Sequence, residues 1–305
     1  MPTLGVGSEL ICLSVANLQL VLDARGTGMR MAVPAAHASF LVDATDGGLA
    51  LSVREGRLRQ GPAWRALCAP PETWQLWQDE RGRYVFVAGQ HSPPARQVTV
   101  DAGFRCGEVL GQFGSYSGPA ESVYPLRNID IILFANWLAE SGDLILHAAG
   151  VQAGERGYCF AGTSGAGKST LAASLLSTWR EAAETATTNG GTVEVLGEDN
   201  LVLRCLEGRF WIYGTPWHQD PAMCSPLGVP LEKLFFLDRT AAAGVESVGP
   251  VEGVARLLQS AFVPYYRPEA VSGILERLAL LAQQVPFYTL SYQLGADVLK
   301  LIREA

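Results

Sequence analysis

The residue types best suited to chemistry lie in one glycine-rich stretch near the middle of the chain. Residues 158–176 read YCFAGTSGAGKSTLAASLL, with the pattern G-x-x-x-x-G-K-S over residues 162–169. The glycines let backbone N–H groups turn toward phosphate oxygens, and the following helix adds its positive N-terminal end. Lys168 supplies a mobile positive charge, and Ser169 offers a hydroxyl to Mg²⁺. The apolar runs on both sides favour a nucleotide-phosphate site over a fortuitous glycine-rich turn. Its expected binding residues are Gly162, Thr163, Ser164, Gly165, Ala166, Gly167, Lys168, Ser169 and Thr170.

Two adjacent carboxylates, Glu198 and Asp199, follow in the apolar run VLGEDNLVL. Neighbouring side chains of a strand point to opposite faces, so two such carboxylates can divide two tasks. We expect Glu198 to accept the proton of an attacking hydroxyl, and Asp199 to hold Mg²⁺ together with Ser169. A solvated turn or strand end is the alternative interpretation, because acidic pairs usually have that role.

Three further residues are candidates for supporting roles. His147 ends the apolar run LILH before the glycine-rich loop, where it could shuttle a proton, stabilise phosphate charge, or be a hydrogen-bonded core residue. Trp217 and His218 lie between two prolines in YGTPWHQDP. They could form a substrate wall near the carboxylates, or fill an edge of the core.

Composition excludes several classes of protein. The 305 residues are 48% hydrophobic and 17% charged, which is typical of a globular protein with a sizeable core. A net charge of -7 and the lack of a basic run argue against a nucleic-acid partner. The longest apolar run, IDIILFANWLA, is too short to span a bilayer, and the N-terminal residues do not read as a signal peptide. With six scattered cysteines and no C-x-x-C pair, we expect a cytoplasmic protein without a membrane partner.

The first part of the chain, residues 1–118, is predicted to be a β-rich domain of unknown role. Short alternating apolar runs are separated by Gly, Pro, Asp and Arg turns, and QLWQDERGRYVFV reads as a hairpin around Arg81 and Gly82. His37 and His91 are expected to lie at the surface or in loops. The stretch GQFGSYSGPAESVYP is rich in breakers and marks the expected domain boundary.

Residues 119–305 are predicted to form a second domain around the phosphate loop. A helix should open at Pro125 and end at Gly142, followed by an antiparallel hairpin, because its turn is too short for a parallel crossover. A second hairpin should turn at Glu207 and Gly208. The other expected elements are helices at 168–179, 251–262, 268–284 and 296–304, strands at 231–239 and 286–293, and a loop at 181–192.

Hairpins on both sides of the phosphate loop favour one fold over the usual parallel-sheet NTPase. From about Tyr124 onward the chain resembles the bacterial HPr-kinase-like proteins. The blocks that carry the resemblance, in order, are YPLRNIDIILFANWLAESGDLILHAAGV, FAGTSGAGKSTLA, LGEDNLVL and YGTPWH. The resemblance implies a mixed, partly antiparallel α/β fold with a phosphate loop, like HPr kinase/phosphorylase and phosphoenolpyruvate carboxykinase, after a β-rich N-terminal domain.

The resemblance also implies roles for individual residues. It makes His147 catalytic, Lys168 and Ser169 the ligands of phosphate and Mg²⁺ in Mg-ATP, and the pair Glu198 and Asp199 the base and metal ligand. Two positions depart from the family pattern, since Glu198 stands where an Asp is usual and Thr170 where true HPr kinases usually carry an acid. The C-terminal signature of the bifunctional enzyme is not found, so phosphorolysis is not expected.

These observations predict an ATP-dependent phosphotransferase that acts on a hydroxyl, in particular that of serine, free or in a peptide or protein. Two alternatives stay open: a nucleotide-gated peptide- or protein-binding module with little catalysis, and a generic phosphate-loop ATPase or small-metabolite kinase. ADP or pyrophosphate as donor also stays open, because the loop reads phosphates and not the base. HPr kinases are hexamers, so a homo-oligomer is compatible with the resemblance.

Overall fold

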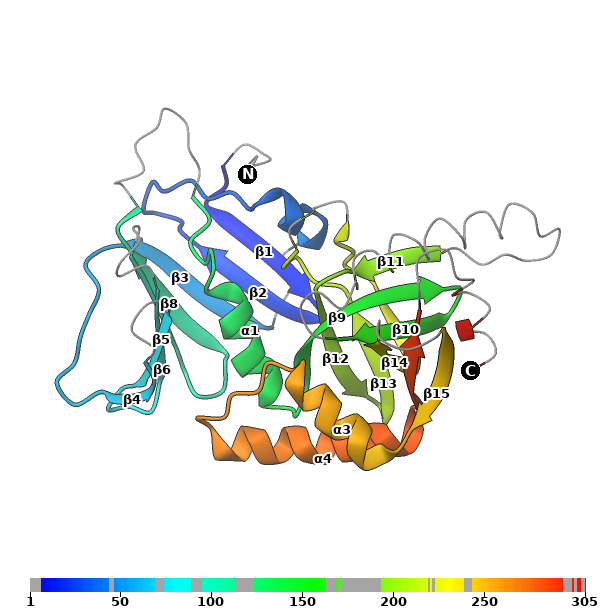
Figure 1. Cartoon of the computed structure of the whole chain (residues 1–305). Coiled ribbons are helices and arrows are strands. Elements are labelled where there is room, and N and C mark those ends of the chain that lie inside the picture. The colour runs from blue at the N-terminus through cyan, green and yellow to red at the C-terminus, as the bar shows by residue number, and fades with distance from the viewer. Residues whose placement is uncertain are drawn as a thin grey trace. The chain divides into compact units, whose positions relative to one another are not determined.

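The structure, a computed structural model, divides the chain into two compact units, Met1–Trp137 and Leu138–Ala305, which are described separately (Figure 1). It describes residues 7–43, 47–69, 74–88, 95–113, 123–162, 168, 171, 193–218, 220, 223–238, 243–292, 298, 301, 302 and 305. The domain boundary predicted at 118/119 stays a prediction, because residues 114–122 lie outside this part. The division by contacts falls later in the chain, within the helix α1.

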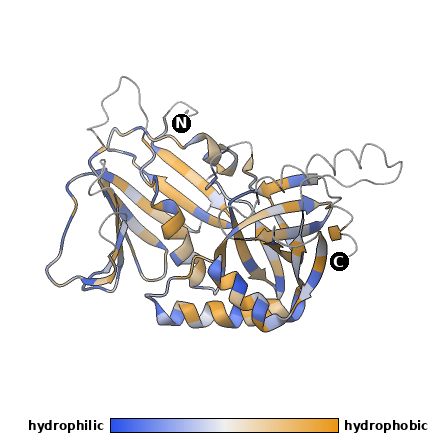
Figure 2. Ribbon diagram, viewed as in Figure 1, coloured by the Kyte–Doolittle hydropathy of each residue, from blue (hydrophilic) through white to orange (hydrophobic). Residues whose placement is uncertain are grey.

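The first unit is built on one eight-stranded sheet with the strand order β1-β2-β3-β8-β7-β6-β5-β4. Its strands are β1 (Leu10–Val15), β2 (Leu18–Asp23), β3 (Leu49–Glu55), β4 (Arg65–Cys68), β5 (Trp74–Gln78), β6 (Tyr84–Ala88), β7 (Arg96–Val100) and β8 (Cys106–Gly111). The predicted hairpin at Arg81 and Gly82 is confirmed as β5–β6. Alternating apolar side chains, visible as orange bands in Figure 2, bury Phe86, Val98 and Val109 on one face.

The first unit also contains a 3-10 helix, η1 (Ala35–Phe40), and α1 (Asp130–Ala139). His37 on η1 is buried, not exposed as expected, and its Nε2 lies 2.9 Å from Oδ2 of Asp130. The Tyr124 hydroxyl donates to the same carboxylate oxygen at 3.1 Å. A buried carboxylate needs such partners, and these come from segments 93 residues apart that no local pattern could connect.

The second unit is also dominated by strands, with one eight-stranded sheet and a closed barrel. Its strands are β9 (Leu144–Ala153), β10 (Arg156–Ala161), β11 (Val193–Gly197), β12 (Asn200–Leu206), β13 (Arg209–Tyr213), β14 (Gly228–Asp238), β15 (Gly244–Val248) and β16 (Phe287–Ser291). In the order β10-β9-β12-β13-β14, five of them form a ring that closes because β14 also pairs with β10.

The predicted mixed α/β fold of the phosphate-loop kinase type is therefore wrong. Antiparallel pairs join β10, β9, β12, β13 and β14 in turn, and the parallel pairing of β14 with β10 closes the curled sheet. Closure needs Gly157, because a Cβ atom there would lie 2.6 Å from Cγ1 of Val229 and 2.9 Å from the carbonyl oxygen of Pro230. The sequence shows the hairpins one by one, but it does not show that the first and last strands of the ring meet.

Individual elements of the second unit agree better with the sequence. Both hairpins are confirmed, as β9–β10 and as β12–β13, whose turn places Glu207 and Gly208 at positive φ. The helices α3 (Pro250–Gln259) and α4 (Pro268–Gln284) and the strands β14 and β16 are also confirmed. The helix predicted from Pro125 begins only at Asp130, because Asn128 has a φ of 65°. Most of the helices at 168–179 and 296–304 and the whole loop at 181–192 lie outside the described residues.

The helices α3 and α4 lie side by side and cover one side of the barrel (Figure 1). Ile274, Leu278 and Leu281 recur at helical spacing on α4 and are fully buried in the same core cluster as Leu146 and Leu201. This packing holds the end of β9 against the helical layer. None of the helices in the described part of the chain has the length and apolar character needed to cross a bilayer.

The end of α1 provides a test of this packing. Gly142 has a φ of 71° in a Schellman motif, in which the N–H of Asp143 bonds to the carbonyl of Leu138 and that of Gly142 to Ala139. A Cβ on Gly142 would lie 2.7 Å from the carbonyl oxygen of Gly273 on α4.

We expect Gly142→Ala to lower the free energy of unfolding for two reasons: a positive φ is unfavourable for alanine, and the added Cβ would clash with the carbonyl oxygen of Gly273. Gly154→Ala is the matched control, since Gly154 has a φ of 61° but no atom within 4 Å of the added Cβ. The control should cost about 1 kcal/mol and Gly142→Ala at least about 1 kcal/mol more. Urea unfolding of the two variants measures the difference, and equal losses would contradict the contact with α4.

Candidate functional site

The strand β9 gathers the predicted site residues, because it pairs with β10 at one edge and with β12 at the other. Ala148 lies opposite Ala161 of β10, and His147 lies opposite Asn200 of β12. The residue that follows Ala161 is Gly162, the first glycine of the phosphate loop. The start of the loop, His147 and the residues before β12 therefore meet at one end of three adjacent strands.

Lys168 extends this group of residues. Its Nζ donates to the carbonyl oxygen of Gly162 at 2.8 Å, and its side chain is buried. Burial lowers the pKa of Lys168, while the negative charge of Asp199 acts in the opposite direction. The ammonium group of Lys168 therefore interacts electrostatically with the carboxylate of Asp199. The remaining predicted loop residues, Thr163, Ser164, Gly165, Ala166, Gly167, Ser169 and Thr170, lie outside the described part of the chain.

Asp199 and His147 form a close contact in which Oδ1 of the carboxylate lies 2.9 Å from Nδ1 of the imidazole. The second oxygen, Oδ2, accepts a hydrogen bond from the side-chain amide of Asn200 at 3.0 Å. The side chains of His147 and Asp199 are 31% and 41% exposed, so a reactant can reach them. Among the described residues, Nε2 of His147 has no hydrogen-bond partner. Asn200 thus holds the carboxylate of Asp199 in place, while Nε2 of His147 stays open to a reactant.

The two adjacent carboxylates lie at a bend between β11 and β12, both of which pair with β9. The carbonyl of Asp199 accepts the N–H of Ala148 at 3.0 Å, which fixes the bend against β9. Burial, then Asp220 and then Glu198 raise the pKa of the Cys224 thiol to about 12. Asp199 thus contacts His147 at this bend, and the role of Glu198 as a proton acceptor stays a prediction.

The buried side chain of His218 binds the backbone of Asp199. Its Nδ1 accepts the backbone N–H of Asp199 at 3.2 Å, and its Nε2 lies 3.2 Å from Oγ1 of Thr215. Because Thr215 donates its own proton to the carbonyl of Asn200 at 2.7 Å, the histidine must donate to Thr215 through Nε2. The ring is thus neutral, and burial lowers the pKa of His218 to about 4.

The neighbouring Trp217 contributes to the same support through its backbone. Its carbonyl accepts the side-chain amide of Asn200 at 2.8 Å, so this amide bridges Trp217 and the carboxylate of Asp199. His218 is buried and faces the backbone of Asp199. His218 therefore contributes to the packing around Asp199, and a substrate-binding role of Trp217 and His218 stays a prediction.

Sequence reasoning assigned no role to Asn200 or to two glycines that complete the site. A Cβ on Gly197 would lie 2.5 Å from Nε2 of His218, and one on Gly214 would lie 2.0 Å from the carbonyl oxygen of Ser225. Both glycines therefore allow the segment with His218 to pack against the bend. Their presence beside the carboxylates in LGEDN and beside the tryptophan in YGTPWH was the signal available in the sequence.

Mg²⁺ fits this set of donors. It is commonly bound by one or two carboxylates together with waters and substrate phosphates, and Asp199 supplies a partly exposed carboxylate whose charge acts on Lys168. In the described part of the chain, no three His, Cys, Asp or Glu side chains gather into a site made of protein ligands alone. Mg²⁺ at a nucleotide site does not require protein ligands alone, because waters and phosphate oxygens complete its coordination.

Comparison with known proteins does not assign the chain to a family. No protein-family model matches it. The search of curated proteins finds no significant match. The chemistry of the site is therefore argued from its residues and their geometry.

The buried neutral His218 predicts a pH-dependent stability. Folding lowers the pKa of His218 from 6.5 to about 4, so between these pH values the unfolded chain binds more protons than the folded one. The stabilising contribution of the neutral ring is therefore complete above pH 6.5. This contribution should be lost as the pH falls from about 6.5 through about 4, and it amounts to about 3 kcal/mol.

Urea unfolding between neutral pH and pH 4 measures this loss in the wild type and in His218→Asn. Asparagine can still accept the N–H of Asp199 but cannot be protonated, so its stability should fall less over this range. An identical pH dependence of the two proteins would show that His218 does not carry the effect.

Proposed function

We propose that this protein transfers a phosphoryl group from ATP to a hydroxyl group, with a serine hydroxyl as acceptor. The observation that carries the proposal is the pair His147–Asp199, joined at 2.9 Å beside a buried lysine that bonds to the first glycine of the phosphate loop. A proton acceptor and a phosphate-binding cation are the two groups that hydroxyl phosphorylation needs from a protein.

The phosphate loop, residues 162–170, holds the nucleotide through its backbone N–H groups. Lys168 stabilises negative charge on the transferred phosphoryl group, and its partial burial strengthens that interaction. Asp199 and Ser169 would hold Mg²⁺, which supplies neutralisation of phosphate charge when it is bound.

In the proposed reaction, His147 accepts the proton. The acceptor oxygen forms a bond to the γ-phosphorus while the bond from this phosphorus to the bridging oxygen breaks and ADP leaves. The hydroxyl proton moves to Nε2 of His147, and the carboxylate of Asp199 stabilises the resulting imidazolium through Nδ1. His147 is preferred to Glu198 as the base because its Nδ1 lies 2.9 Å from Oδ1 of Asp199 while its side chain stays partly exposed to a reactant.

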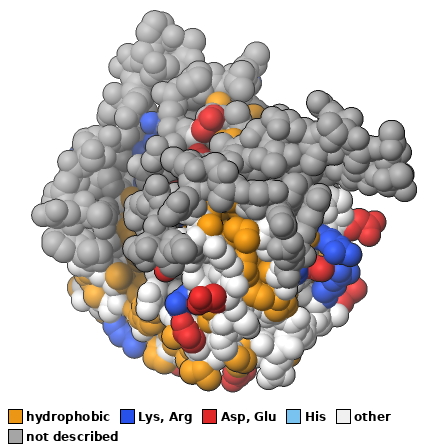
Figure 3. Space-filling model, turned by 45° about the vertical axis from the view of Figure 1, so that its right-hand side comes forward, with side chains coloured by type: hydrophobic (Ala, Val, Ile, Leu, Met, Phe, Trp, Pro, Cys, Tyr) orange, Lys and Arg blue, Asp and Glu red, His pale blue; other side chains and the backbone are white. Residues whose placement is uncertain are grey.

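The acceptor belongs to a serine-containing small molecule, peptide or protein. The net charge of -7 disfavours a nucleic-acid partner. On the face drawn in Figure 3, the Lys and Arg side chains do not merge into one continuous basic patch. A polypeptide or small molecule needs no strongly basic surface, which agrees with this charge distribution.

Substitution of the proton acceptor and its partner tests the proposed reaction. We expect His147→Gln and Asp199→Asn to lower the rate of transfer from γ-labelled ATP by at least about a hundredfold, with ATP affinity changed only a few-fold. Glu198→Gln is the matched control and should lower the rate less than about tenfold. The assay uses free serine, serine peptides and co-purifying proteins as acceptors.

The opposite pattern, loss in Glu198→Gln with activity kept in Asp199→Asn, would move the role of the base to Glu198. Tight ATP binding by the wild type, with neither transfer nor hydrolysis, would overturn the phosphotransferase and leave a nucleotide-gated binding module.

A second variant tests the phosphate site by itself. Lys168→Met keeps a side chain of similar length in the buried position but removes its charge, so the free energy of unfolding should change little. ATP affinity, measured by calorimetry, should fall at least about tenfold because the outer phosphates lose their cation. Unchanged ATP affinity would contradict phosphate binding by this loop.

A further inference from the structure

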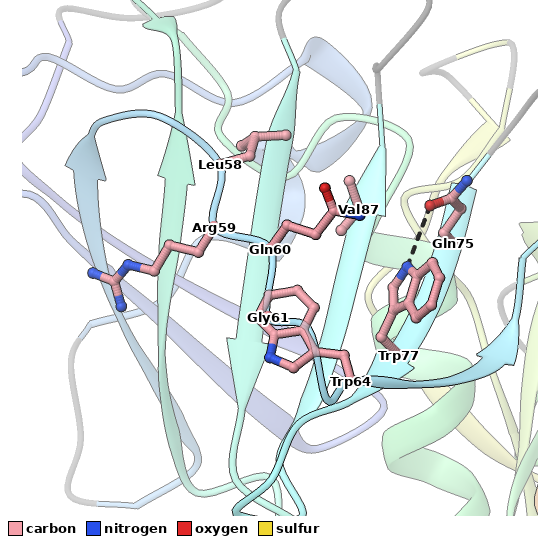
Figure 4. A pocket seen from close by; sticks show the side chains of 8 residues that line it. All are labelled: Leu58, Arg59, Gln60, Gly61, Trp64, Gln75, Trp77 and Val87. Carbon is pink, nitrogen blue, oxygen red and sulfur yellow. Dashed lines mark hydrogen bonds between the residues drawn. The ribbon is translucent and has the colours of Figure 1, made fainter.

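The first unit contains a pocket of about 110 Å³ between the sheet and the segment that precedes β4 (Figure 4). Two tryptophan side chains, Trp64 and Trp77, line it together with Val87 and the amides of Gln60 and Gln75. All of these residues are far in sequence from the phosphate loop. The pocket is therefore a feature of the β-rich unit, for which the sequence suggested no role.

The strand pattern fixes one wall of this pocket. Gln75 and Trp77 are two residues apart on β5, and Gln75 lies opposite Val87 of β6, so the three side chains share one face. On the opposite wall, the indole of Trp64 lies against the backbone of Gly61, where a Cβ would come within 2.2 Å of Nε1. The absence of a side chain at Gly61 thus allows the indole of Trp64 to take this position.

The lining is electrically neutral. Its one charged side chain, Arg59, forms an ion pair with Glu108 at 2.7 Å, and its backbone N–H is bonded to Gln97. The indole N–H of Trp77 donates to Oε1 of Gln75 at 3.2 Å, which leaves the amide N–H groups of Gln75 for a carbonyl oxygen (Figure 4). Such a lining suits a neutral apolar ring flanked by a carbonyl, and not a phosphate or a carboxylate.

Size and surroundings restrict the ring further. An engineered cavity of about 150 Å³ holds benzene, so this pocket encloses only one small ring. The adjoining strand β4 is the last of its sheet, and in the described part of the chain no strand pairs with its outer edge. Arg65 and Ala66 on this strand are exposed. An extended polypeptide can therefore pass along the edge and place one side chain in the pocket.

We propose that this indole pocket binds a prolyl ring of an extended, proline-rich peptide segment of a partner or substrate protein. Proline offers a small, neutral ring, and proline-rich chains are extended before binding, so they lose little entropy on an aromatic surface. The inference goes beyond phosphoryl transfer, because it rests on residues of the first unit alone.

Fluorescence anisotropy of a labelled proline-rich peptide, titrated with the full chain without nucleotide, tests this inference. We expect saturable binding, and at least about tenfold weaker binding of the same peptide with every proline replaced by alanine. Trp64→Ala and Trp77→Ala should each weaken binding at least about tenfold. Trp74→Phe is the matched control, since Trp74 lies on β5 but points to the other face, and it should leave affinity unchanged.

Gly61→Ala separates loss of the site from loss of folding. The added Cβ displaces the Trp64 indole, a movable side chain, while all aromatic residues are kept. We expect an unchanged unfolding midpoint together with weaker peptide binding.

The proposal would be overturned if the wild type binds both peptides equally or neither, or if Gly61→Ala and Trp64→Ala bind as well as the wild type. Trp64-dependent binding of a neutral sugar or nucleoside, without binding of the peptide, would also overturn it and assign a different ligand. A catalytically inactive Asp199→Asn protein should bind the peptide normally, so this result and the result on phosphoryl transfer are independent.

Discussion

The double pairing of β9 is the constraint on which the candidate site depends. Because β9 bonds to β10 at one edge and to β11 and β12 at the other, it fixes the start of the phosphate loop and the acidic bend at once. The 2.9 Å contact of His147 with Asp199 follows from this register. A shift of one residue would turn His147 to the other face of the sheet and separate the pair.

The supporting contacts around this pair depend on close approach of neighbouring segments, which explains the glycines. The His218 ring accepts the N–H of Asp199, and the Asn200 amide donates to its carboxylate, but the segment with His218 can approach only because Gly197 and Gly214 lack side chains. Gly157 has the same role where β10 meets β14 and closes the barrel. Glycines thus permit both the closure of the barrel and the packing around Asp199.

The two units offer two different kinds of surface. The second unit brings together charged and titratable groups, Lys168, His147 and Asp199. The first unit contains a pocket lined by the aromatic rings of Trp64 and Trp77. The proposed phosphoryl transfer and the proposed peptide binding would together describe an enzyme that selects a polypeptide substrate.

The phosphate loop, most of which lies outside the described residues, stays a prediction from the sequence. The sequence by itself determined the local features that the structure confirms: the hairpins β5–β6, β9–β10 and β12–β13, and the helices α3 and α4. These follow from spacing, turn residues and side-chain alternation, which act over a few residues. Only the tertiary structure decided that the strands close into a barrel, that His37 is buried against Asp130, and that His218 is a neutral support. Each of these depends on contacts between residues far apart in the chain, and the sequence pattern carries no information on such distances.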